Sequence, residues 1–103
     1  MKFLVSFMAH EGGTSAERIE SSKRLLEVYS KWVPPQSQKF EAFVNRVDGT
    51  GGYALIETDD AEGLLLSSDE FSPWLKFDVV PVMDVGEAVA VGARAMDFLD
   101  SIP

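Results

Sequence analysis

The chain has 103 residues, a formal net charge of −8, one histidine and no cysteine, and 46% of its residues are hydrophobic. This length and composition suit a single globular domain over residues 1–103 with one core. The lack of cysteine excludes disulfides, thiolate nucleophiles and cysteine-ligated metals, and a single histidine excludes a multi-histidine site within one chain. The acidic charge argues against nucleic acid or an anionic membrane as a partner, because both attract basic surfaces.

The first third of the chain predicts a strand followed by a helix. Residues 2–9 form an apolar run that stops before a Gly-Gly pair, which is typical of a buried strand. The run is too short to span a membrane and lacks a signal-peptide cleavage site, so we expect a cytoplasmic protein. Thr14 and Glu17 have capping-box spacing, which marks a helix start. The helix must end at Pro34-Pro35.

The middle of the chain predicts a β-hairpin and a second helix. Residues 39–47 alternate between polar and apolar types, which indicates a strand. A glycine-rich turn follows over residues 48–52, and residues 53–58 return as a third strand. A second helix is expected from Asp59, and it is expected to fade over residues 67–70.

The last third predicts a fourth strand over residues 77–83 and a final helix that starts at Asp84. Pro81 suits an edge strand, because proline has no amide to donate to a neighbouring strand. Asp59 and Asp84 each stand three residues before a glutamate, so both are expected to cap their helices. The element order β-α-β-β-α-β with an extra C-terminal helix predicts an α+β, ferredoxin-like fold with an antiparallel sheet.

Apolar residues are expected on both faces of this sheet. The first strand places Leu4 and Met8 on the face opposite its phenylalanines. Strict alternation in the second strand places Phe43 on the face opposite Phe40. Soluble monomers rarely expose such a face, so the sequence predicts a homodimer in which each chain covers the open sheet face of the other.

Three sequence stretches resemble a known family. The segment Gly52–Asp60, the pair Pro73-Trp74 and the pattern Phe77-x-Val79-x-Pro81-Val82 resemble short bacterial proteins that form a domain of unknown function and begin Met-Lys-Phe-Leu-Val, as this chain does. The family is similar to the dimeric α+β barrel superfamily, which implies a barrel formed by two chains. That superfamily includes cofactor-free monooxygenases, haem-degrading enzymes, lyases and plain binding proteins, so the resemblance implies a fold and no single activity.

Four aromatic residues are the candidate walls of a pocket between the sheet and the helices: Trp32, Tyr53, Phe71 and Trp74. Aromatic walls suit a flat apolar ligand, and ordinary core packing is the alternative interpretation. His10, at the end of the first strand, is the candidate general base, and the alternative is a polar residue at a solvent-facing strand end.

These residues support two main hypotheses of function. The first is a small homodimeric module that binds a small, partly aromatic ligand between sheet and helices. The second is a cofactor-free, monooxygenase-like enzyme that acts on a phenolic or keto substrate with His10 as the base. A third, an interaction module for a basic partner, depends on the net charge alone. No cofactor or metal is expected, because the pair Asp59-Asp60 lacks calcium-loop spacing and is explained by helix capping.

Overall fold

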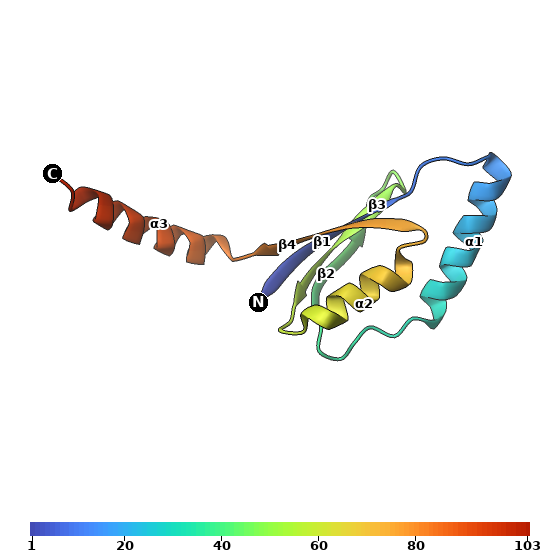
Figure 1. The fold of residues 1–103 in the computed structure, drawn as a ribbon, viewed down its shortest axis with the longest axis horizontal. Helices are drawn as coiled ribbons and strands as arrows, with labels where there is room; N and C mark the ends of the chain where they lie inside the picture. Colours follow the sequence, from blue (N-terminus) through green and yellow to red (C-terminus); the bar gives the residue numbers. More distant parts are fainter.

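A four-stranded antiparallel sheet organises the fold, and the computed structural model describes all residues from 1 to 103 (Figure 1). The strands are β1 (Lys2–Ala9), β2 (Lys39–Asn45), β3 (Gly51–Glu57) and β4 (Leu75–Val82). The helices are α1 (Ser15–Lys31), α2 (Ala61–Phe71) and α3 (Val85–Asp100). The strand order is β2-β3-β1-β4, which is consistent with a ferredoxin-like arrangement, so the predicted α+β fold is confirmed.

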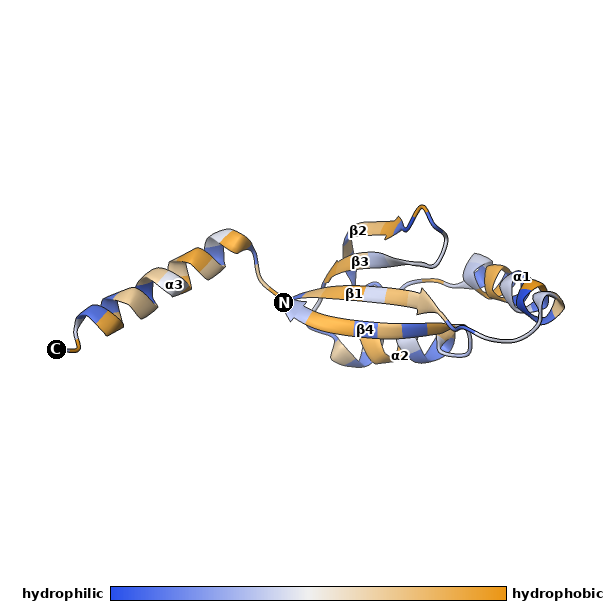
Figure 2. Ribbon diagram, turned by 90° about the horizontal axis from the view of Figure 1, so that it is seen from above, coloured by the Kyte–Doolittle hydropathy of each residue, from blue (hydrophilic) through white to orange (hydrophobic).

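The sheet has one face covered by helices and one open face (Figures 1 and 2). The buried core lies on the covered face and joins β1, β3 and α2: Val5, Ala54, Ile56 and Leu64. In contrast, α1 contains no buried residue and lies farther from the sheet than α2 (Figure 1). Because α1 buries no residue against the sheet, space remains between this helix and the sheet.

The structure confirms the predicted edge strand and corrects the predicted end of the second helix. β4 is an edge strand, as Pro81 predicted, and this residue pairs with Phe3 of β1. The second helix continues to Phe71 and does not fade over residues 67–70. Ser68 stays helical there, and its hydroxyl donates to the Leu64 carbonyl at 3.0 Å.

A β-bulge in β2 changes the predicted positions of two aromatic side chains. The register breaks between Phe40 and Ala42, which leaves Glu41 as an extra residue. Beyond the break, Phe43 faces the helices, and its ring centroid lies 5.3 Å from that of Phe40. The prediction that these two residues lie on opposite faces was therefore wrong, because strict alternation holds only in a strand without a bulge.

Side-chain caps start the first two helices. The predicted capping box of α1 is confirmed, since the Glu17 amide donates to the Thr14 hydroxyl at 3.1 Å. The cap of α2 is Asp60, one residue later than the predicted Asp59, and its carboxylate accepts from the Gly63 amide at 2.9 Å. Both helices thus have a satisfied amide in their first turn.

The third helix begins without such a cap and leaves the body of the molecule. The Asp84 side chain makes no capping bond, so the predicted cap is wrong. Its carboxylate instead accepts from the Lys2 ammonium at 3.0 Å, and the same ammonium lies 3.2 Å from Glu41. These contacts raise the pKa of Lys2, chiefly through its hydrogen bond to Asp84. They hold the start of α3 at the end of the sheet.

Beyond this point α3 projects away from the sheet (Figures 1 and 2), and the molecule measures 67 × 30 × 21 Å. No residue of α3 is buried. Large apolar side chains are exposed along it: Val85, Val89, Val91, Met96, Phe98 and Leu99. The helix therefore carries an apolar face that no part of its own chain covers.

The capping carboxylate of Asp60 makes the stability of the fold depend on pH. Hydrogen bonds from the Ser37 hydroxyl and from the Gly63 amide lower the pKa of Asp60 below its ordinary value. A lowered folded-state pKa means that the stabilisation is complete above the ordinary carboxyl pKa of about 4. It is lost as the pH falls through the folded-state pKa.

We expect Asp60→Asn to flatten the decline of the melting temperature between about pH 5 and about pH 2. Asparagine keeps a capping oxygen but does not titrate, whereas Asp60→Ala removes the cap and lowers the melting temperature at neutral pH by a few degrees. Thermal unfolding followed by circular dichroism measures both effects. An Asp60→Asn profile as steep as that of the wild type would contradict the role assigned to this carboxylate.

Candidate functional site

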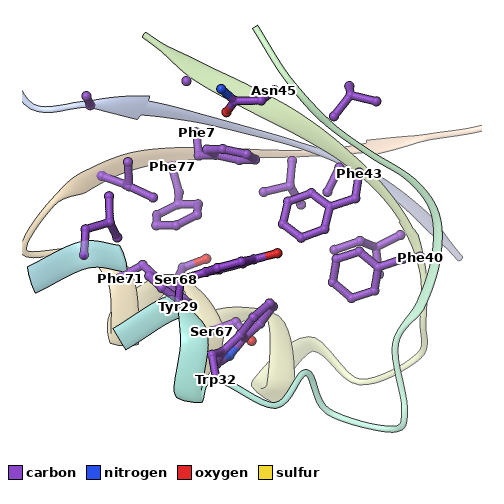
Figure 3. A pocket seen from close by; sticks show the side chains of 18 of the residues that line it. Phe7, Tyr29, Trp32, Phe40, Phe43, Asn45, Ser67, Ser68, Phe71 and Phe77 are labelled. Atoms are coloured by element: carbon purple, nitrogen blue, oxygen red, sulfur yellow. The ribbon is translucent and has the colours of Figure 1, made fainter. Parts of the chain in front are cut away.

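A cavity of about 610 Å³ lies between the covered face of the sheet and helices α1 and α2 (Figure 3). Ligand sites in proteins commonly range from about 300 to about 1,000 Å³, so this cavity has the size of a small-molecule site. Of its 24 lining residues, 16 are hydrophobic, so an apolar molecule is the favoured occupant.

The side chains on the central strands explain why the cavity exists. On β3, Ala54 faces the helices and is too small to fill the space beneath α1. On the neighbouring strand, Phe7 lies opposite Gly52, and a Cβ atom on that glycine would be only 2.5 Å from the Phe7 ring. Small residues in the middle and large rings around them leave a hollow with aromatic walls.

The aromatic walls come from both the sheet and the helices. Seven rings line the cavity: Phe7, Tyr29, Trp32, Phe40, Phe43, Phe71 and Phe77. Edge-to-face contacts hold several of them, with 5.3 Å between the ring centroids of Trp32 and Phe71. The bulge in β2 contributes directly, because it places both of that strand's phenylalanines in the wall.

The polar groups of the wall are neutral. No aspartate, glutamate, lysine, arginine or histidine lines the cavity. The polar lining residues other than the aromatics are Ser22, Gln38, Asn45, Thr50, Ser67 and Ser68. Three side-chain atoms of the lining residues are buried without a hydrogen-bond partner: Trp32 Nε1, Gln38 Nε2 and Ser67 Oγ.

Two of the four predicted pocket residues lie in this wall. Trp32 is the residue that ends α1, and Phe71 is the last residue of α2. Tyr53 lies on the open face of the sheet, where it pairs with Ser6 of β1, and its hydroxyl is 3.4 Å from the Arg46 guanidinium. The structure therefore brings Trp32 and Phe71 together and places Tyr53 on the other side of the sheet.

The remaining predicted residues lie near the end of β1. The imidazole Nε2 of His10 is 2.9 Å from the carbonyl oxygen of Ser72, and the His10 amide donates to the Trp74 carbonyl at 3.1 Å. His10 is exposed, and neither His10 nor Trp74 lines the cavity. The two contacts of His10 connect the end of β1 to the segment that follows α2, and they lie outside the cavity wall.

Sequence reasoning missed most of the aromatic wall. Phe7 and Phe77 face the helices in a regular alternation, which made them look like ordinary core. Tyr29 stands three residues before Trp32 on α1, and this helical spacing was the available signal that both side chains share a face. The positions of the two β2 phenylalanines depend on the bulge, for which the alternation pattern gives no signal.

Two further observations concern metal binding and membrane crossing. No group of three or more histidine or acidic side chains is arranged to hold a metal ion. None of the three helices combines the length and the apolar character that a membrane crossing needs.

Residues 1–96 match a protein family described as Domain of unknown function (DUF3303). No curated protein matches the chain.

Proposed function

The chain belongs to the DUF3303 family, and we propose that it is a small homodimeric module that binds a small, partly aromatic ligand in the cavity between sheet and helices. The observation that carries this proposal is the cavity of about 610 Å³ with seven aromatic rings in its wall. Small-molecule sites are concave and mostly apolar, with a few polar groups, so a hollow of this size and lining favours a binding site.

The open face of the sheet supports the homodimer. Four large side chains on this face each have about two fifths of their surface exposed: Leu4, Met8, Tyr53 and Val80. A second copy that packs the same face against the first covers them all, as in a dimeric α+β barrel. The uncovered apolar face of α3 also favours association, because soluble monomers rarely expose contiguous apolar patches.

The proposal does not extend to catalysis. An enzyme that uses His10 as a base needs this imidazole within hydrogen-bond reach of the bound molecule. His10 lies outside the cavity wall and contacts a backbone carbonyl. No observation in the structure favours the monooxygenase-like alternative over a binding protein.

Native mass spectrometry of gently purified protein tests both parts of the proposal. We expect a dimer that carries additional mass, either copurified or taken up from added 2-acetylnaphthalene, a flat aromatic probe. A Ser68→Phe variant should lose the additional mass and stay dimeric, because the new ring fills the cavity from α2. The matched control Ser21→Phe adds the same ring at an exposed position outside the cavity and should keep it. A monomer would overturn the dimer, and a protein that takes up no probe would overturn the ligand site.

A further inference from the structure

The wall of the cavity restricts the charge of its ligand. A carboxylate, phosphate or ammonium group placed there loses its water and finds no ion of opposite charge, since no charged side chain lines the cavity. Transferring an unpaired charge into such surroundings is strongly unfavourable. The cavity therefore favours an uncharged ligand, in addition to an aromatic one.

The unpartnered atoms indicate which polar group the ligand carries. The indole N–H of Trp32 and the carboxamide NH₂ of Gln38 can only donate hydrogen bonds, and both are buried without an acceptor. Gln38 is 8% exposed, so water does not replace the missing partner. Almost all buried polar groups in folded proteins are paired, and unpaired ones often mark a functional site. Because the protein supplies no acceptor for these two donors, we expect the ligand to carry one.

These donors lie along one side of α2. A Cβ atom on Gly63, in the first turn of α2, would be 3.3 Å from the Gln38 amide nitrogen. The Trp32 ring contacts Phe71 at the other end of the same helix, and Ser67 lies between the two ends. Figure 3 shows Trp32 and Ser67 at the helix side of the cavity, across from the phenylalanines of the sheet. A flat molecule that lies between these two sides has rings on one face and donors on the other.

We propose that the ligand is an uncharged, flat aromatic molecule with at least one carbonyl-type oxygen, which accepts a hydrogen bond from one of the two donors, Trp32 or Gln38. This inference rests on the proposed function, because it names the chemical class that the same cavity binds. Both residues line the cavity but their donor nitrogens are buried, so the proposal requires the donor side chain to turn toward the ligand oxygen.

Three matched probes test the inference by equilibrium dialysis against the full-length protein. The ketone 2-acetylnaphthalene has the acceptor, 2-isopropenylnaphthalene has the same shape without it, and 2-naphthoate has a negative charge. We expect the ketone to bind about tenfold more tightly than the hydrocarbon, as one buried hydrogen bond allows, and the carboxylate to bind at least about tenfold more weakly than the ketone.

Variants assign the preference to the two donors. Gln38→Leu should lower the ketone-to-hydrocarbon ratio, and Trp32→Phe combined with Gln38→Leu should bring it to about one. The control Gln36→Leu changes the same residue type at an exposed position outside the cavity and should keep the wild-type ratio.

The outcomes separate this inference from the proposed function. Equal binding of ketone and hydrocarbon to the wild type would overturn the acceptor and leave the ligand site intact. Tightest binding of 2-naphthoate would overturn the requirement for an uncharged ligand. Failure of both neutral probes to bind would overturn the proposed function itself.

Discussion

Gly51→Ala is expected to destabilise the fold by about 3 kcal/mol, because overpacking between two paired strands leaves no flexible side chain to move aside. A Cβ atom on Gly51 would overlap the backbone carbonyl oxygen of Phe7 and lie 2.9 Å from the Cα atom of Met8. Gly51 pairs with Met8 in the β1–β3 ladder, so relief of the clash requires the two strands to separate. Chemical denaturation followed by circular dichroism measures the free energy of unfolding.

Gly86→Ala is the control for this substitution. Gly86 lies in α3, and an added Cβ atom there meets no heavy atom within 4 Å. The expected change in the free energy of unfolding is below about 1 kcal/mol, and a gain in stability is favoured by the helix propensity of alanine. If Gly51→Ala costs no more than Gly86→Ala, then the close contact between β1 and β3 does not constrain the fold.

Leu64→Ala is expected to cost about 3 kcal/mol of unfolding free energy, which is typical of truncating a buried leucine. Leu64 is 7% exposed, and it is the only residue of α2 in the central core cluster. Its loss removes apolar contacts and leaves a void beside Val5 and Ile56, which line the ligand cavity. Urea denaturation gives the change in stability.

The adjacent leucine provides the matched comparison. Leu65 is 63% exposed on the same helix, so Leu65→Ala should cost less than about 1 kcal/mol. Equal costs for the two variants would contradict the assignment of Leu64 to the core and of Leu65 to the exposed side of α2.

The fold could be predicted because the signals that specify it are local. The capping box at Thr14 and Glu17 and the proline at position 81 each depend on a few neighbouring residues, and the structure confirms both. The bulge at Glu41 and the ion pair between Lys2 and Asp84 depend on residues that meet only after the strands pair. Periodicity along one segment carries no information about such contacts.

The candidate site was harder to predict for the same reason. Trp32 was a sound candidate because a large aromatic residue at a helix end suggests a partly open wall. Tyr53 looked similar in the sequence, yet alternation along β3 directs it to the open face. Gly52 makes room for the Phe7 ring of the wall, since a Cβ atom on Gly52 would lie 2.5 Å from that ring, and this contact exists only after β1 and β3 pair.

The projection of α3 separates the two ends of the chain. The terminal amine of Met1 lies 3.4 Å from the Asp59 carboxylate beside the sheet. The C-terminus lies beyond a 16-residue helix, which is about 24 Å long at 1.5 Å per residue. For immobilisation on a sensor surface, the carboxyl end is therefore the natural attachment point. A tag there leaves the cavity accessible to ligands in the flow, whereas a tag at the amino end disturbs the Asp59 contact.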